Sequence, residues 1–328
     1  MSQDSADLVS FRLARSIAPA PRSRSHVADR VFSALLVGSA WFILIVVLGL
    51  LAVLVHASWP AIKAVGLHAV DNIDWDPTND HYGVLSFVYG TAVTSCIALA
   101  IAGPIGVAVA LFLSELAPRR IAGAIGVLVE LLAAVPSVVY GLWGLFVLAP
   151  VMRTYVQPAL TKSLGFLPLF QGPPLGIGML TGGILLSIMI LPTVAAIARD
   201  VFIAVPIDQR EGMLALGATK WEMLTKAVLP YARSGVIGAL VLAVGRAMGE
   251  AMAVVMVIGN TPAVSASLFR PAYTMASVLA NEFTEATGST YVSMLIEIGL
   301  LLFGLSLVVN VIARALVWSV APRAGRAR

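Results

Sequence analysis

The distribution of apolar residues along the chain predicts six membrane-spanning helices. A helix needs about 20 apolar residues to cross a bilayer, and stretches of at least this length recur between polar or Pro/Gly-rich segments. We place the six spans at about 31–55, 84–113, 121–150, 175–198, 235–258 and 290–317. Because proline removes a helical hydrogen bond, we expect span two to be interrupted at Gly103-Pro104 and span three to be broken at Pro136. The predicted fold class is all-α and polytopic.

The two ends of the chain differ from the membrane domain between them. Residues 1–29 are rich in Ser, Pro and Arg and have no apolar period, which predicts a flexible tail. The first apolar stretch is far longer than the roughly 7–15 residues of a signal peptide, so we expect it to be retained as a helix. The predicted membrane domain covers 30–320, and a short basic tail follows at 321–328.

Basic residues are distributed unevenly between the two sides of the predicted topology. Six spans put both termini on one side, together with the loop at 199–234. That side carries sixteen Lys and Arg residues and the opposite side carries four. Since Lys and Arg are enriched in cytoplasmic loops, we expect both termini and the 199–234 loop of this multi-pass protein to be cytoplasmic.

Composition excludes several classes of function. Hydrophobic residues make up 59% of the 328 residues and charged residues only 12%, which no soluble globular domain shows. The basic residues are scattered around apolar segments, so no nucleic-acid partner is expected. The single cysteine and the four histidines form no metal-ligand spacing, and no Ser/His/Asp or HExxH arrangement indicates an enzyme. We expect no metal site, no bound cofactor and no catalytic residue.

The loop at 199–234 predicts two short helices separated by a glycine. Gly217 stands where a helix would end, because glycine adopts the left-handed conformation easily. Capping boxes, in which the side chains at a helix start satisfy free N–H groups, are predicted at Asp208 with Glu211 and at Thr219 with Glu222. Leu229-Pro230 is expected to end the second helix.

This amphipathic segment presents apolar side chains that include Leu216 and Trp221. An interfacial helix lying on lipid is the simpler interpretation, but two caps around a glycine favour a shaped contact with another protein. The spacing from Gly212 to Gly217 is that of a phosphate-binding loop, yet the following Lys-Ser/Thr is missing. ATP is therefore expected on a partner.

Span five carries two charges, Arg246 and Glu250, spaced four residues apart. On a continuous helix this spacing places them on one face where they can touch. They are either a structural ion pair or groups on a substrate pathway, and the cost of burying them favours the pathway. We expect Arg246 to bind an oxyanion, and we expect Glu250 to neutralise Arg246 when the site is empty. Gly238, Gly245 and Gly249 form a ridge for close approach of another helix.

Two further acids lie in apolar stretches, and four aspartates lie in the polar segment after span one. Glu130 is near the cytoplasmic end of span three, where a structural role is favoured. Glu297 lies within span six, where a structural and a functional role are equally expected. The aspartates at 71–80 lack ligand spacing, which leaves a solvated face or a contact with an extracytoplasmic protein.

EGMLALGATKWEMLTKAVLP resembles the cytoplasmic loop signature of ABC importer permeases. Glu211, Gly217, Leu229 and Pro230 match that signature, whereas Gly212 and Met213 replace its two alanines and Ala227 replaces a larger aliphatic residue. The longer stretches YARSGVIGALVLAVGRAMGEAMAVVMVIGN, WDPTNDHYGVLSFVYGTAVTS, LFLSELAPRR and ELLAAVPSVVYGLWGLFVLAP resemble the PstC-type permeases of phosphate ABC transporters. The likeness covers most of residues 30–320.

The resemblance implies a MetI-like permease core that imports inorganic phosphate. It implies a second, similar permease subunit, a cytoplasmic ATPase dimer that binds ATP and Mg²⁺, and an extracytoplasmic phosphate-binding protein. It further assigns Arg246 and Glu250 to phosphate passage, and it assigns Glu211, Gly217, Leu229 and Pro230, with the neighbouring Leu216 and Trp221, to a loop docked on the ATPase.

Two alternatives remain. The chain could be a sister permease or serve another oxyanion, or it could be a proton-coupled secondary carrier. Carriers of that kind usually show two matching halves, and residues 1–160 and 161–328 show no such repeat.

Overall fold

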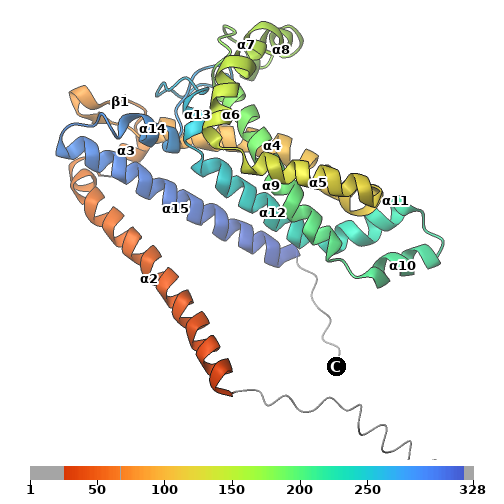
Figure 1. Ribbon diagram of the computed structural model, residues 1–328. Coiled ribbons are helices and arrows are strands. Elements are labelled where there is room, and N and C mark those ends of the chain that lie inside the picture. Colours follow the sequence, from red (N-terminus) through yellow and green to blue (C-terminus); the bar gives the residue numbers. More distant parts are fainter. Residues whose placement is uncertain (1–25, 67, 321–328) are drawn as a thin grey trace, which may run out of the picture. The chain divides into compact units, whose positions relative to one another are not determined.

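The computed structural model describes residues 26–66 and 68–320 and is built almost entirely of helices (Figure 1). The chain divides between Val53 and Leu54 into two units. Within the described residues, the first unit is most of helix α2 (His26–Ala64), and the second contains all the other elements. Residues 1–25 of the predicted N-terminal tail and the whole predicted tail at 321–328 lie outside the described residues.

Six helices among the described residues are long and apolar enough to cross a membrane, which confirms the predicted number of spans. Three are single helices: α2, α9 (Met179–Ile203) and α15 (Ser289–Val320). The other three are continuous runs of α-helix and wider π-helical turns. Their parts are α4 (Leu85–Leu111) with η2 (Phe112–Leu116); α6 (Ser137–Trp143), η3 (Gly144–Leu148), α7 (Ala149–Val151), η4 (Met152–Val156) and α8 (Gln157–Leu164); and α11 (Lys220–Met223), η6 (Leu224–Val228) and α12 (Leu229–Gly249).

Proline affects these helices less than the sequence predicts. The expected interruption at Gly103-Pro104 is wrong, because α4 continues through Pro104 to Leu111. The turn around this proline is packed, with Ala102, Gly103 and Gly106 all buried, and packing against neighbouring helices compensates for one missing hydrogen bond. Pro192 is likewise accommodated inside α9.

Four other prolines follow directly after a π-helical turn. At Pro118 the helix ends, because Ala117 is extended, and at the other three it continues. The residues just before Pro150, Pro158 and Pro230 each donate their N–H to the carbonyl five residues back, within η3, η4 and η6. Such a wider turn relieves the clash between a proline ring and the carbonyl four residues before it. The predicted helix end at Leu229-Pro230 is therefore wrong, and so is the predicted loop from residue 151, where the helix continues to Leu164.

The break predicted at Pro136 is confirmed. Helix α5 (Arg119–Ala134) ends there, Val135 is extended with φ −64° and ψ 129°, and α6 starts after Pro136. A second break lies where the sequence predicts a continuous fifth span to residue 258. Helix α12 ends at Gly249, and the short α13 (Met252–Val255) follows separately.

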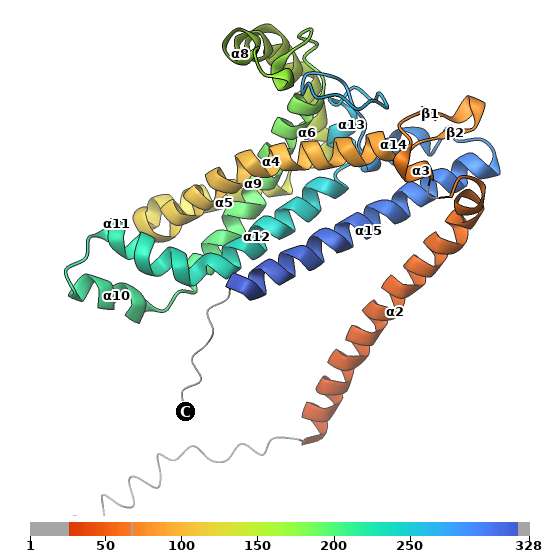
Figure 2. The ribbon, with the colours of Figure 1, turned by 180° about the vertical axis from the view of Figure 1, so that it is seen from behind.

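Helix α9 is the centre of the second unit, because it packs against α4, α5 and α12, while α12 also packs against α4 and α15 (Figure 2). Small residues allow the close contact between α4 and α9. A Cβ atom added to Gly106 would lie 2.8 Å from the Val194 side chain, and one added to Gly183 would lie 2.6 Å from that of Ile97. The buried core along α9 includes Leu186, Ile190 and Phe202.

The two ends of this unit carry different structures. One end carries the hairpin formed by α10 (Ile207–Ala215) and the start of the α11 run. The opposite end carries α3 (His68–Asp71), β1 (Trp75–Asp76), η1 (Pro77–Asn79), β2 (His81–Tyr82), η5 (Pro168–Phe170), α13 and α14 (Met275–Glu282). Strands β1 and β2 pair antiparallel with Trp75 opposite Tyr82. The Trp75 indole N–H donates to Glu282 Oε2 at 2.9 Å, and the Tyr291 hydroxyl donates to the same oxygen at 2.8 Å.

The aspartates of this end serve local turns where the structure shows their contacts. Asp76 accepts hydrogen bonds from the Asn79 side chain and from the Thr78 N–H, and these bonds lower the pKa of Asp76. Asp80 accepts a hydrogen bond from the Tyr82 hydroxyl at 3.2 Å. These contacts support the interpretation of a solvated, self-supporting loop.

We predict that Gly90→Ala destabilises the bundle. A Cβ atom on Gly90 would lie 2.0 Å from the backbone oxygen of Tyr273, and backbone cannot move aside as a side chain end can. Overpacking of this kind costs about 1–3 kcal/mol, so the thermal unfolding midpoint of the purified protein should fall. Gly304→Ala on α15 is the control, because nothing lies within 4 Å of the added Cβ. Equal midpoints for the two variants would contradict the packing described.

Candidate functional site

The hairpin of α10 and α11 turns sharply at Gly217, as predicted. Gly217 has φ +81°, its N–H donates to the Leu214 carbonyl at 3.0 Å, and the Ala218 N–H donates to the Met213 carbonyl at 3.1 Å. This pair of bonds satisfies two carbonyls that the end of α10 would leave free. The turn is therefore fixed by backbone hydrogen bonds.

Helix α11 begins at the predicted capping box. The Glu222 N–H donates to Thr219 Oγ1 at 3.3 Å, and the Thr219 N–H donates to Glu222 Oε2 at 3.0 Å. Lys226 Nζ lies 2.9 Å from Glu222 Oε1. The box predicted at Asp208 and Glu211 is wrong, because α10 starts earlier, after Pro206, whose side chain makes no cap. Asp208 lies within the first turn, where its charge favours the helix dipole.

The hairpin has a packed face and an open face. Met223, Leu224 and Val228 are buried against residues of α4 and α9. On the other side Leu216 is 85% exposed and Trp221 is 69% exposed, and Glu211 is also exposed. Leu229 packs against the buried cluster, while Pro230 is exposed on the first turn of α12. Two large apolar side chains next to a rigid turn make a contact surface that this chain leaves uncovered.

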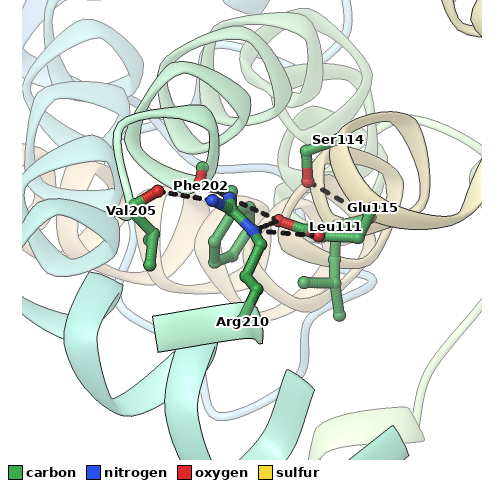
Figure 3. A network of polar contacts seen from close by, with 6 residues as sticks. All are labelled: Leu111, Ser114, Glu115, Phe202, Val205 and Arg210. Atoms are coloured by element: carbon green, nitrogen blue, oxygen red, sulfur yellow. Dashed lines mark hydrogen bonds and ion pairs between the residues drawn. The ribbon is translucent and has the colours of Figure 1, made fainter. Parts of the chain in front are cut away.

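Arg210 joins this hairpin to the ends of two bundle helices (Figure 3). Its Nη2 atom lies 2.7 Å from Glu115 Oε1 in η2, the continuation of α4. The same guanidinium donates to the carbonyl of Phe202, at 2.7 Å, and to that of Val205. The Arg210 side chain is 19% exposed and that of Glu115 is 8% exposed.

These contacts give Arg210 two tasks. It neutralises a buried carboxylate, and it satisfies carbonyls at the C-terminal end of α9, where a positive charge also favours the helix dipole. No local pattern predicts this pair, since its members are 95 residues apart and each resembles an ordinary loop charge. The hairpin, α4 and α9 are therefore linked by one side chain.

Arg246 lies in the last turn of α12, on the side of the helix that is exposed. Its Nη1 atom donates to Thr193 Oγ1 on α9 at 3.3 Å. The predicted contact with Glu250 is absent, because the ion pairs found among the described residues are Arg210–Glu115 and Lys226–Glu222. Glu250 is extended, with φ −76° and ψ 117°, so the four-residue spacing no longer directs it onto the face of Arg246.

The glycine ridge of α12 is open in this chain. A Cβ atom added to Gly238, Gly245 or Gly249 would meet nothing within 4 Å. With Leu242, which is 57% exposed, and Arg246, these glycines form what we call the open face of α12. The opposite side is buried through Ala239, Ala243 and Ala247. The open face is thus apolar and small, with one cation near its end.

Among the described residues, the other two predicted acids form no hydrogen bond with the open face of α12. Glu130 is exposed on α5, and Glu297 is buried in α15 at 6% exposure. The Oε2 atom of Glu297 has no hydrogen-bond partner among the described residues. In the same part of the chain, no three His, Cys, Asp or Glu side chains gather closely enough to hold a metal ion. The roles of Glu130 and Glu297 stay predictions.

The sequence is similar to known transport proteins over nearly its whole length. Residues 102–321 match the family described as binding-protein-dependent transport system inner membrane component. The phosphate transport system permease protein PstC of Mesorhizobium japonicum is 43% identical over 315 residues, which are 95% of this chain and 96% of the relative. The protein of the same name from Xylella fastidiosa is 44% identical over 306 residues, covering 92% and 94% of the two chains.

The fold is also found in a solved transporter. A chain of a bacterial alginate ABC transporter, solved in complex with an alginate pentasaccharide-bound periplasmic protein, superposes with a TM-score of 0.52. The match covers 87% of this chain and 93% of that chain at 15% sequence identity. At this identity the likeness concerns the arrangement of the helices.

We predict that Arg210→Lys loosens the hairpin while Lys226→Arg does not. Lysine cannot reach Glu115 and two carbonyls at once, because its donors sit on a single nitrogen, whereas Lys226 makes one exposed ion pair.

Removing one partner of a buried pair costs about 3–5 kcal/mol, so Arg210→Leu should lower the unfolding midpoint more than the double variant Arg210→Leu/Glu115→Leu. Additive effects of the two substitutions would show that Arg210 and Glu115 are not coupled.

Proposed function

We propose that this chain, which belongs to the family of binding-protein-dependent transport system inner membrane components and to its PstC-type phosphate permeases, passes phosphate along the open face of α12. The chain is a multi-pass membrane subunit of a phosphate ABC importer. It is a transport subunit, and we assign ATP and Mg²⁺ binding to a separate ATPase. The proposals below concern the pathway, the coupling surface and the orientation.

One observation carries the proposed pathway: Arg246 lies on an exposed helix face, and within the described residues its guanidinium hydrogen-bonds to a neutral hydroxyl, that of Thr193, and forms no ion pair. A charge inside a membrane protein is costly without an opposite charge. The planar guanidinium offers paired donors that fit a phosphate oxyanion. Phosphate bound at Arg246 would supply both the missing charge and acceptors for its free N–H groups.

A second permease subunit would complete this pathway. The glycines of the open face leave room for another helix to approach closely. A subunit placed there would cover Arg246 and enclose a passage between the two chains. The heterodimer expected from the sequence accounts for a small-residue face that this chain does not itself bury.

Glu250 would act on the anion from the next turn. The chain leaves the α-helix at this residue, and an interruption of a membrane helix beside a charge is typical of transport sites. A carboxylate there can accept a hydrogen bond from a protonated phosphate oxygen, whereas sulfate, which is fully ionised, would be repelled. It can also approach Arg246 when no anion is bound.

The hairpin is the proposed contact with the ATPase dimer. Leu216 and Trp221 are exposed beside a turn held by backbone bonds, as a surface that fills a cleft should be. A displacement of α10 would be transmitted to α4 and α9 through Arg210 and Glu115. Because Thr193 on α9 contacts Arg246, the same helix would carry that movement to the anion site.

The hairpin and both termini are proposed to face the cytoplasm, on the asymmetry of basic residues. The opposite end of the second unit, with β1, β2 and α14, would then face outward. The rigid cluster of Trp75, Tyr291 and Glu282 supports the acidic loop of that end. We propose this end as the contact for an extracytoplasmic phosphate-binding protein.

We predict that Arg246→Lys and Glu250→Gln lower phosphate uptake by the reconstituted complex about tenfold or more, because lysine lacks the paired donors of the guanidinium and glutamine lacks the charge of the carboxylate. The measurement is phosphate accumulation in proteoliposomes that contain the binding protein and both permeases, with ATP supplied to the ATPase. Arg233→Lys, at an exposed position outside the pathway, is the matched control and should transport normally. Wild-type uptake by both Arg246→Lys and Glu250→Gln in assembled complexes would refute the pathway.

We predict that Leu216→Glu and Trp221→Glu release the ATPase. A charge placed on the apolar surface cannot be buried in a protein cleft without a large desolvation cost. The amount of ATPase that co-purifies with the permease should fall sharply. Phe166→Glu is the control, because Phe166 is 75% exposed near the opposite end of the unit. Full ATPase recovery with both hairpin variants would contradict the coupling, and phosphate uptake in vesicles lacking any ATPase would favour a secondary carrier.

A further inference from the structure

A second cation in the bundle lacks a partner. Arg199 lies in the last turns of α9, and its Nε atom is buried without a hydrogen-bond acceptor in the part of the chain that the structure describes. The ion pairs found among those residues do not include it. Arg210, by contrast, is fully engaged by Glu115 and two carbonyls. Arg199 therefore has an unsatisfied donor and no counter-ion among the described residues, whereas Arg210 has a counter-ion.

The neighbouring helix makes room for this guanidinium. Gly126 of α5 is buried, and a Cβ atom added to it would lie 2.7 Å from Arg199 Nη1. The cation is thus held between α9 and α5, and its long side chain does not extend freely along the helix surface. A position fixed by a glycine on the facing helix distinguishes Arg199 from a surface arginine.

Arg199 and Thr193 border the same open side of α9. In this part of the helix Val194, Ala195, Ala198 and Phe202 are buried, and Thr193, Ala196, Ile197, Asp200 and Ile203 are not. At about 100° per residue, the buried residues occupy one side of α9. Thr193 lies near the middle of the other side, towards α12, and Arg199 lies at its edge, towards α5.

We propose that Arg199 is a second phosphate-binding station, on the exit side of Arg246. It rests on the function proposed above, in which phosphate first meets Arg246 beside Thr193. Arg199 follows Thr193 by six residues on the same helix, which is about 9 Å along the axis towards the hairpin. Transport needs sites that bind well enough to be entered and weakly enough to be left, and two stations at successive depths meet both needs.

The charged residues around Arg199 favour release of a bound anion. Asp200 follows it in sequence, and Glu130 lies one helical turn beyond Gly126 on α5; both carboxylates are exposed. Neither forms an ion pair with Arg199, but their negative charge weakens the hold on an anion. The second station is therefore weaker than the first, as the last site before the cytoplasm must be.

The test measures phosphate uptake and ATP hydrolysis by the complete complex in proteoliposomes. Arg199→Gln should lower the maximal uptake rate about tenfold, the effect of losing one charged hydrogen bond. The concentration of loaded binding protein that gives half-maximal uptake should stay unchanged, because the entry site is intact. Arg233→Gln, which removes an exposed cation outside both stations, should transport normally. Normal uptake by Arg199→Gln would overturn the proposal.

Charge rescue separates a binding role from a structural one. The chain has one cysteine, Cys96, so Arg199→Cys in a Cys96→Ser background is the only thiol of this subunit. Attaching a positively charged ethylammonium group to that thiol before reconstitution should restore uptake, and attaching a negative ethylsulfonate group should not. Equal uptake after both modifications would overturn the proposal. Gly126→Ala, which displaces the guanidinium but keeps its charge, should lower uptake by less than Arg199→Gln.

Two further comparisons distinguish transported phosphate from a lipid headgroup, and failure of the second station from failure of the proposed function. A lipid headgroup carries the same phosphate chemistry, so the ratio of wild-type to Arg199→Gln uptake is measured in vesicles with and without anionic phospholipid. A constant ratio supports transported phosphate, and a ratio that follows lipid composition overturns it. Normal uptake by Arg199→Gln, with defective uptake by Arg246→Lys, would reject only the second station. Normal uptake by both would reject the proposed function itself.

Discussion

The ion pair between Arg210 and Glu115 holds three parts of the molecule together. Glu115 lies in the last turn of the α4 run, Phe202 and Val205 lie at and just beyond the end of α9, and Arg210 belongs to the hairpin, so one guanidinium contacts all three. A buried pair of this kind adds little net stability, because desolvation offsets the attraction. Its value lies in geometry, since five donors in a fixed plane define the position of α10 relative to both helix ends. In the proposed mechanism, these contacts would transmit movement of the hairpin to α4 and α9.

The same requirement, that polar groups inside a membrane find partners, explains the irregular helices. Pro150, Pro158 and Pro230 each follow a π-helical turn in which the preceding N–H still finds a carbonyl, five residues back. The chain thereby keeps a continuous helix where an aqueous protein could end one and let water satisfy the carbonyls. Pro136 has no such turn before it, and there the helix breaks. Such a turn is neither necessary nor sufficient for continuity, because α4 and α9 continue through Pro104 and Pro192 without one, and the helix ends before Pro118 despite η2.

The varied effects of proline on these helices limit how far the sequence could predict the structure. Six spans, the glycine turn at Gly217 and the capping box at Thr219 follow from local patterns and are confirmed. The helix across Pro230 and the break at Glu250 differ from what the local spacing of residues predicts. Among the site residues, Arg246 could be found because a charge in an apolar segment is conspicuous. Glu115, Arg210 and Arg199 could not, because loop and helix-end charges are common and their partners are distant in sequence.

The uncompensated charges of this bundle indicate what the isolated chain lacks. Arg246 contacts only a hydroxyl, and Arg199 is packed against a glycine without an anion. Both cations border surfaces that this chain does not cover, on α12 and α9. A stable membrane protein could have used leucine at both positions at lower cost. Arg246 on the open face of α12 and Arg199 on α9 therefore fit the proposed passage, in which the second wall is another subunit and the counter-ions are the transported anions.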